Sequence, residues 1–251
     1  MAEASKRAGG GNGSKPRGSL PKRFFTDVGI EADGDGRVAL LLDGKKVRTP
    51  GKASLRLPSK ALAEAIAEEW RRQGERIDPE TMPLTKLANS IIDGMEGSEA
   101  AVIDDILGYA GSDLLCYRAK GPAGLVARQN QQWDPVLDWA KRDLGAPMQL
   151  SEGVMHVEQP QGSLAAIRAR LAGFDTWSLA ALHVMTGLSG SALLALAVAL
   201  GRLTPQEAWE AAHVDEDWQI SQWGEDAEAK DRRARRHRDF TAAARMLSLL
   251  S

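Results

Sequence analysis

Residues 37–70 read RVALLLDGKKVRTPGKASLRLPSKALAEAIAEEW, and along this stretch the spacing of apolar residues changes from that of strands to that of a helix. The first half has apolar runs separated by Asp43-Gly44, a pair favoured in two-residue β-turns because both central residues need positive φ. In the second half Leu62, Ile66 and Trp70 recur on one helical face, and Ser59 precedes them as a candidate cap. The stretch therefore predicts a small antiparallel sheet covered by a helix.

The predicted sheet extends toward the N-terminus through a second turn, at Asp33-Gly34-Asp35-Gly36. We expect four strands, at Phe25–Glu31, Arg37–Leu42, Lys45–Thr49 and Ser54–Leu57. A sheet of this size is not stable alone and needs the helix that follows, which we expect to end at Gly74.

Beyond residue 85 no comparable strand pattern occurs, and helical spacing dominates. The predicted helices are Leu87–Met95, Ser98–Tyr109, Leu125–Asp143, Ser163–Leu171, Pro205–Glu210 with its continuation, and Asp226–Leu250. Strands followed by helices indicate an α+β fold rather than alternating βαβ units. We predict a disordered basic tail at 1–22, a small antiparallel β-rich N-terminal domain with its covering helix at 23–95, and a larger all-helical C-terminal domain at 96–251.

The stretch Trp177–Gly201 has no Asp, Glu, Lys or Arg and is long enough to imitate a membrane span. The turn-forming cluster Gly187–Ser191 divides it into two segments that are each too short to cross a bilayer. Asp175 can cap the first segment and Ser189 or Ser191 the second. We therefore predict a buried helical hairpin and no membrane insertion.

Composition excludes several classes of protein. With 251 residues, 43% hydrophobic residues and a net charge of -2, the chain can form a sizeable core and has no overall field that attracts polyanions. The single cysteine, Cys116, excludes an internal disulfide and a multi-cysteine metal cage. The basic tail contains no apolar run of a secretion signal, so we expect a cytoplasmic protein in a bacterium, or a matrix protein if the source is mitochondrial.

No motif indicates a catalytic residue, a cofactor or a metal. Phosphate-binding glycine loops are missing, and the four histidines do not form a helical metal pair. We interpret Cys116 as an inert buried thiol and His213–Asp217 as an exposed acidic helix turn rather than a calcium loop.

Two features suggest contact with other molecules. The basic run Lys230–Arg238 could meet nucleic-acid phosphates, but it has no interleaved aromatic residues, so a solvated helix face is favoured. Trp218 and Trp223 stand among acidic residues and glutamines, a mixture typical of protein interfaces, although one of them could simply pack inward.

In their order along the chain, the motifs resemble one known family, the assembly chaperones for the alpha subunit of F-type ATP synthase (the ATP-twelve family, assembly factor two in animals). The resemblance runs from about Arg23 to Gly224. It is carried by Arg23-Phe24-Phe25, Leu42-Asp43-Gly44, Val47-Arg48-Thr49-Pro50, Leu57-Pro58-Ser59, Ala67-Glu68-Glu69-Trp70, Gln73, Met82-Pro83-Leu84-Thr85, Leu87-Ala88-Asn89, Asp93, Asp113, Tyr117-Arg118, Gln129, Trp133-Asp134-Pro135, Asp215-Glu216-Asp217-Trp218-Gln219-Ile220 and Trp223-Gly224.

The resemblance implies a chaperone, not an enzyme, that holds the new alpha subunit until the beta subunit takes its place. It also implies a β-rich domain beside a helical one. On matching positions it assigns client contact first to Glu216, then to Asp215, Asp217, Gln219 and Trp223. Glu69 and Trp70 come second, because the place of Trp70 on the apolar helix face indicates a structural role. In this chain Asp215 and Asp217 stand where family members often have Glu, and Trp218 where Phe or Tyr is common.

Three alternatives remain open at the level of sequence. The first is a chaperone or interaction module for another oligomeric client, the second a nucleic-acid-associated protein that uses Lys230–Arg238, and the third a hydrolase without a recognisable motif. Nothing resembles a self-complementary coiled-coil seam, so we expect a monomer.

Overall fold

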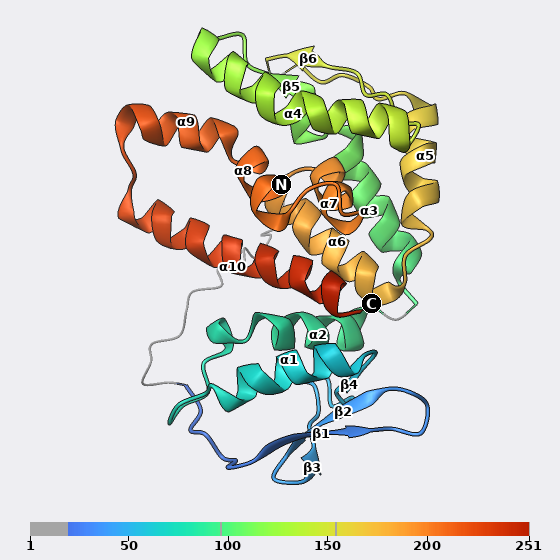
Figure 1. The fold of residues 1–251 in the computed structure, drawn as a ribbon, viewed down its shortest axis with the longest axis vertical. Helices are drawn as coiled ribbons and strands as arrows, with labels where there is room; N and C mark the ends of the chain where they lie inside the picture. Colours follow the sequence, from blue (N-terminus) through green and yellow to red (C-terminus); the bar gives the residue numbers. More distant parts are fainter. Residues whose placement is uncertain (1–19, 96, 154, 251) are drawn as a thin grey trace, which may run out of the picture.

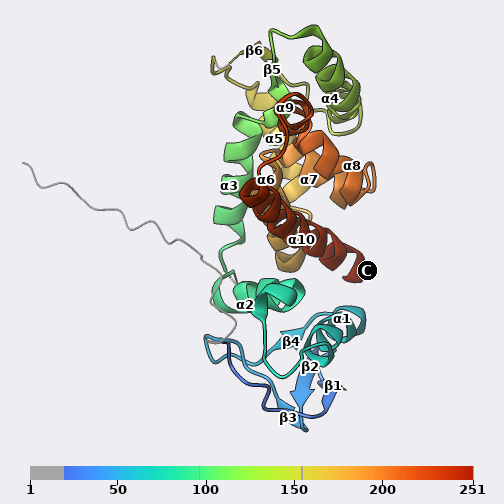
Figure 2. The same cartoon turned by 90° about the vertical axis from the view of Figure 1, so that its left-hand side faces the viewer.

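The computed structural model describes residues 20–95, 97–153 and 155–250 and has the predicted α+β architecture. A small sheet with two helices lies at one end of the molecule, and a larger helical domain lies at the other (Figures 1 and 2). Most of the predicted basic tail falls outside the described residues. Within the described part, the backbone of Lys22 forms an isolated β-bridge with Arg76, and the Pro21 carbonyl accepts from the Ile77 N–H at 2.9 Å. Contact with the first domain, the sheet and its two helices, therefore begins before residue 23.

The sheet has its second strand at the centre. The strands are β1 (Val28–Ala32), β2 (Val38–Leu42), β3 (Lys45–Lys46) and β4 (Arg56–Leu57), and β2 pairs antiparallel with each of the other three. Asp43 and Gly44 both have positive φ, at 47° and 74°, which confirms the predicted two-residue turn. The predicted turn at Asp33–Gly36 joins β1 to β2, and the Asp33 N–H closes it by donating to the Arg37 carbonyl at 2.7 Å.

Helices α1 (Lys60–Arg71) and α2 (Pro83–Gly94) complete the first domain, with the short 3-10 helix η2 (Pro79–Thr81) between them. The Ser59 hydroxyl accepts from the Leu62 N–H at 3.1 Å, which confirms the predicted cap. Leu62 and Ile66 of α1 are fully buried in the same apolar cluster as Leu40 of the sheet. Helix α1 ends at Arg71, three residues before the predicted stop at Gly74.

Nine α-helices or 3-10 helices lie between residue 97 and residue 250 in the described ranges. They are α3 (Glu99–Gly111), η3 (Leu114–Cys116), α4 (Ala123–Asp143), α5 (Gln161–Leu171), α6 (Thr176–Ser189), α7 (Ala192–Ala199), α8 (Pro205–Ala212), α9 (Val214–Trp223) and α10 (Ala227–Leu249). The all-helical prediction needs one correction. Strands β5 (Tyr117–Arg118) and β6 (Ser151–Glu152) form a parallel pair between two loops, too short to leave a period-two pattern in the sequence.

The predicted buried hairpin is α6 followed by α7, and it forms the centre of the helical domain. The Asp175 carboxylate accepts from the N–H groups of Trp177 and Ser178, and the Ser191 hydroxyl accepts from the Leu194 N–H. Gly190, with φ of 73°, caps the C-terminal end of α6. No helix among the described residues has both the length and the apolar character needed to span a bilayer.

The last helix of the chain joins the two domains. The second half of α10 packs against α2 and α6, and its Ala242 and Met246 belong to the apolar cluster of the first domain. The Ser59 hydroxyl also donates to the carbonyl of Leu249. The first half of α10 is largely exposed and runs away from this junction toward α9 (Figure 1).

Candidate functional site

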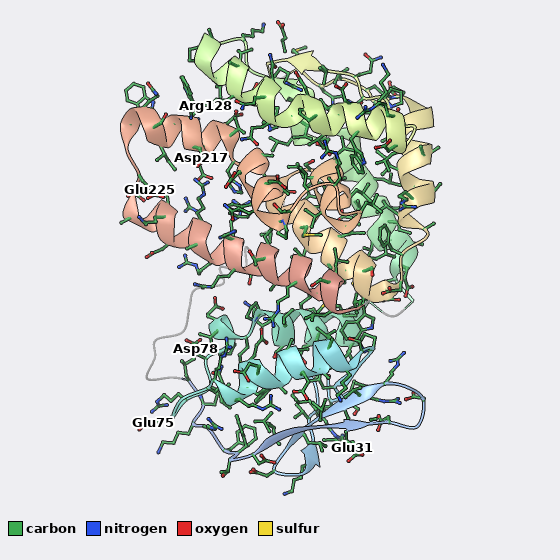
Figure 3. The ribbon with its side chains drawn as sticks, in the orientation of Figure 1. Glu31, Glu75, Asp78, Arg128, Asp217 and Glu225 are labelled. Atoms are coloured by element: carbon green, nitrogen blue, oxygen red, sulfur yellow. The ribbon has the colours of Figure 1, made fainter. Side chains whose placement is uncertain are left out.

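Five of the seven predicted contact residues lie on α9, a helix at the edge of the helical domain. Helix α9 runs beside α4 and turns at Gly224, which has φ of 86°, into the start of α10 (Figures 1 and 3). Its first turn carries Asp215, Glu216 and Asp217. Negative charge in this position is favourable because the N-terminus of a helix carries partial positive charge.

Two of these three carboxylates are committed to contacts inside the protein. The Asp215 carboxylate accepts from the side-chain amide nitrogen of Gln129 on α4 at 2.7 Å. The side-chain oxygen of Gln129 in turn accepts from the Ala119 N–H at 2.8 Å. Asp217 lies 2.5 Å from the guanidinium of Arg233 on α10. The two aspartates therefore fix α9 to its neighbours on both sides.

Glu216 has the weakest internal contact of the three. Its carboxylate lies 3.8 Å from Nε2 of His213 and its side chain is 43% exposed. Burial lowers the pKa of His213, whose Nδ1 is hydrogen-bonded to the Trp209 carbonyl, so the imidazole is uncharged at neutral pH. Glu216 thus keeps a carboxylate available to a partner. The buried His213 also corrects our interpretation of His213–Asp217 as an exposed turn.

The two tryptophans of α9 face opposite ways. The Trp218 ring packs against Gly124 at the start of α4, with the Arg128 guanidinium 5.0 Å from its ring centre. Trp223, at the end of α9, is 87% exposed, and Gln219 is exposed on the same helix. Exposed tryptophan is costly in water and is enriched in protein interfaces. Trp218 therefore packs inward, which is the alternative that the sequence left open, and Trp223 is exposed to solvent.

Glu69 and Trp70, the second-choice contact residues, have structural surroundings. The Glu69 carboxylate accepts from the N–H groups of Leu84 and Thr85, both at 2.8 Å, and from the Thr85 hydroxyl at 2.7 Å. It therefore caps α2, which explains why α2 begins at Pro83 and not at Leu87. Burial outweighs these bonds and raises the pKa of Glu69. Trp70 packs edge-on against Phe25 at 5.5 Å. Their role in client contact stays a prediction.

The basic run Lys230–Arg238 is only partly free for other molecules. Lys230 lies 3.2 Å from Glu225, Arg233 pairs with Asp217, and Arg236 donates to the Leu188 carbonyl at 2.7 Å. Within the described ranges no group of three or more potential metal ligands occurs. Cys116 is fully buried, as expected, and burial raises the pKa of its thiol to about 12.

This arrangement of domains matches solved structures along nearly the whole chain. Residues 22–141 match the family model of the ATP12 chaperone protein. The structure of Atp12 from Paracoccus denitrificans is 42% identical in sequence, has a TM-score of 0.86, and aligns over 92% of this chain and 99% of its own. The chain belongs to the ATP12 chaperone family. This finding confirms the resemblance inferred from the motifs.

Two further solved structures agree with this assignment. A structure from Agrobacterium tumefaciens, described as that of a proposed chaperone, is 51% identical with a TM-score of 0.89 and covers 92% of this chain and 87% of its own. A Paracoccus denitrificans Atp12 mutant with an aspartate changed to lysine is 42% identical, with a TM-score of 0.85. The family assignment thus rests on both sequence and fold.

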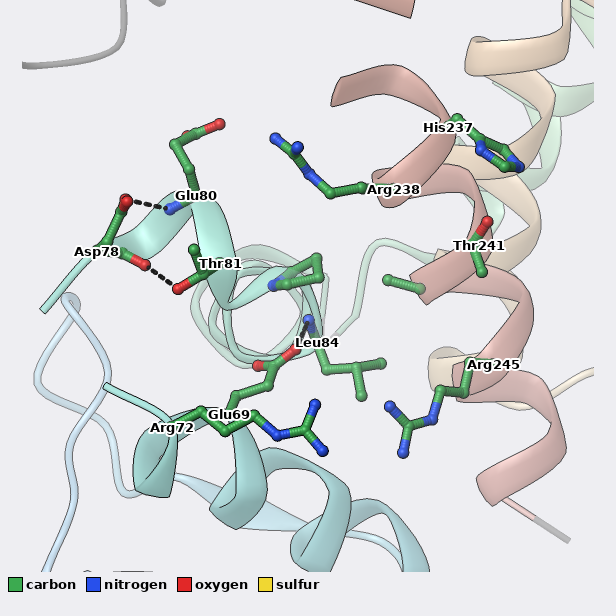
Figure 4. Close-up of a pocket in the computed structure, with 12 residues that line it drawn as sticks. Glu69, Arg72, Asp78, Glu80, Thr81, Leu84, His237, Arg238, Thr241 and Arg245 are labelled. Carbon is green, nitrogen blue, oxygen red and sulfur yellow. Dashed lines mark hydrogen bonds between the residues drawn. The ribbon is translucent and has the colours of Figure 1, made fainter. Parts of the chain in front are cut away.

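Sequence reasoning missed a cleft between the two domains of this ATP12 chain. Its volume is about 690 Å³, and it lies between α10 and the segment from α1 through η2 to α2 (Figure 4). The walls are far apart in sequence, so no local motif marks it. The one local signal was the series Arg238, Thr241 and Arg245, which recurs on one face of the predicted last helix.

Proposed function

We propose that this protein is an assembly chaperone that binds the unassembled alpha subunit of F-type ATP synthase and prevents its aggregation until the beta subunit replaces it. The observation that carries the proposal is the match to the structure of Atp12 from Paracoccus denitrificans, at 42% identity over 92% of the chain. Membership of a chaperone family supports a role in ATP synthase assembly. That the client is the alpha subunit goes beyond family membership and is our proposal.

The α9 surface supports a binding role of this kind. It presents one large exposed aromatic side chain, Trp223, together with the available carboxylate of Glu216 and the exposed amide of Gln219. Aromatic anchors within a polar rim are typical of interfaces that exchange partners. An alpha subunit without beta exposes an apolar interface that aggregates, so a surface that covers it until beta competes would prevent this.

The proposed action needs binding alone and no catalytic step. We further propose that the protein works as a monomer in the bacterial cytoplasm, in line with its relatives from bacterial species. The nucleic-acid alternative has less support, since Lys230 and Arg233 of the basic run are engaged by acidic residues of α9 and its following loop.

The test begins with purified full-length protein and newly refolded alpha subunit. Light scattering should show that the protein suppresses aggregation of alpha, and size-exclusion chromatography should show co-elution with alpha but not with beta. Addition of beta should displace the chaperone, and ATP should not be consumed beyond the rate of alpha alone. Failure of the wild-type protein to bind or protect alpha refutes the proposal.

Site variants should avoid the aspartates that hold α9 in place. Glu216→Lys and Trp223→Ala change groups without a strong internal contact, so we expect folded proteins with alpha affinity about tenfold lower, the usual effect of truncating an interface anchor. Glu158→Lys is the matched control, because it makes the same charge change on an exposed residue of the loop before α5. Equal loss in Glu158→Lys would contradict a specific α9 contact.

A further inference from the structure

The cleft between the domains has two chemically different walls. One wall is the face of α10 that carries Arg238, Thr241 and Arg245, and Figure 4 shows the Arg238 and Arg245 side chains directed toward the first domain. The His237 ring instead stacks on Trp209 of α8, 4.9 Å away. The other wall is formed by α1, η2 and the start of α2. Its volume of about 690 Å³ is within the roughly 300–1,000 Å³ typical of ligand-binding pockets.

The acidic groups of the cleft are already engaged. Glu69 accepts three hydrogen bonds from α2, the Glu80 carboxylate lies 3.4 Å from Lys86, and Asp78 accepts from the Glu80 N–H at 3.0 Å. These carboxylates therefore belong to the local structure of the wall.

The basic groups are not engaged in the same way. Arg238 and Arg245 are exposed, and neither guanidinium has a hydrogen bond or ion pair with any other described residue. Arg72, on the opposite wall, uses its Nε for Glu68 at 2.8 Å. Along α10 as a whole, seven lysines and arginines stand against three acidic residues. The cleft therefore offers two guanidinium groups, those of Arg238 and Arg245, that make no hydrogen bond or ion pair within the described residues, although the charge of Arg245 acts on Glu69.

We propose that this cleft binds an extended acidic segment of the alpha subunit, with Arg238 and Arg245 as donors to its carboxylates. Seven residues of helix separate the two arginines by about 10 Å. In an extended chain, side chains two or four residues apart share a face and lie about 7 or 13 Å apart, a spacing that the long arginine side chains can match. Pro83 supplies apolar surface between the walls, and Leu84 and Ala242 lie almost fully buried behind it. Arginine is suited to this role because its planar group binds carboxylate with two parallel hydrogen bonds. The inference rests on the proposed function and adds a second contact to α9.

Affinity for alpha separates the inference from the proposed function. The double variant Arg238→Glu with Arg245→Glu should bind alpha about 100-fold more weakly than wild type, at about tenfold for each lost arginine contact. Changing both arginines to Lys keeps the charge but not the paired hydrogen bonds, so we expect an intermediate loss. The control is the double variant Arg170→Glu with Arg202→Glu, which changes two exposed arginines outside the cleft. Its affinity for alpha should change by less than about threefold. Circular dichroism checks that every variant is folded.

A crosslinking measurement identifies the occupant directly. Cys116 is buried and its thiol is unreactive, so Thr241→Cys introduces a single labelling site on the α10 wall. A photoreactive group at this position should crosslink to alpha, and mass spectrometry should map the crosslink to a segment with at least two acidic residues. Ala165→Cys, exposed on α5, is the control and should give no such product.

The outcomes are distinct. Wild-type protein that does not bind alpha refutes the proposed function itself. Wild-type binding with unchanged affinity in the double Glu variant, or a crosslink that maps to a segment without acidic residues or to a second copy of this chain, overturns the cleft inference and leaves the proposed function in place. Loss of affinity in the cleft variants together with a crosslink to an acidic segment supports it.

Discussion

Replacing Gly124 by Ala tests whether the packing of α9 on α4 controls the proposed client surface. A Cβ at Gly124 would lie 2.6 Å from one ring carbon of Trp218 and 2.9 Å from another. Real Cβ contacts need about 3.5 Å or more, so the rigid indole ring and the helix that carries it have to move by almost 1 Å. The substitution therefore acts on α9 through a single methyl group.

The size of the effect follows from two opposing contributions. Alanine in a helix is more stable than glycine by about 0.5–1 kcal/mol, whereas overpacking a filled contact costs about 1–3 kcal/mol. We expect Gly124→Ala to lower the free energy of unfolding by about 1 kcal/mol. Gly162→Ala is a matched control, because Gly162 is also the second residue of a helix after a proline cap and its Cβ would meet nothing within 4 Å. That variant should gain about 0.5 kcal/mol.

Urea unfolding of both variants and of wild type gives these differences, and binding to alpha should weaken in Gly124→Ala alone. A Gly124→Ala protein as stable as Gly162→Ala would show that Trp218 relaxes at no cost and would refute the packing argument. Loss of stability with unchanged affinity for alpha would show that the packing of Trp218 does not affect client binding.

Three further predictions concern buried groups. Burial raises the pKa of Asp113 to about 6 from 3.8; its stabilising contribution is therefore complete below about pH 4 and lost as pH rises through 6, so wild type should lose about 3 kcal/mol relative to Asp113→Asn over this range, measured by urea unfolding at several pH values. Glu69→Gln should destabilise by about 1 kcal/mol in urea unfolding, because the new amide nitrogen faces the N–H of Leu84 or Thr85; an unchanged stability would contradict the capping role of Glu69. Cys116 should react with a thiol reagent only in urea, and rapid modification of the native protein would contradict its burial.

Local signals in the sequence predicted local structure well. The turn at Asp43-Gly44 and the caps at Ser59, Asp175 and Ser191 each depend on one or two neighbouring residues, and the structure confirms all four. The predicted turn at Asp33–Gly36 is also present, between β1 and β2. There the Arg56 side chain pairs with Asp33 and Asp35 from another strand, a tertiary contact that the local sequence does not show.

The candidate site was predictable as a region but not residue by residue. The sequence places Asp215, Glu216 and Asp217 together, yet their roles depend on Gln129, 86 positions away, and on Arg233 of the next helix. A carboxylate held by an internal partner and one left for a client look the same in sequence. The interdomain cleft was missed for a similar reason, since its walls are joined only by the fold.

The way α10 joins the domains limits how the cleft can bind a client. Its second half places Ala242 and Met246 in the core of the first domain, and its first half carries Arg238 over the opening. Opening the cleft by a hinge would expose Met246 and the adjoining apolar surface, at about 1.5–3 kcal/mol for each large side chain. Two such side chains alone reduce an open population by about a thousandfold. For the proposed client binding, domain opening would therefore lower the apparent affinity by this factor, and binding to the preformed opening, with movement of the arginine side chains alone, is favoured.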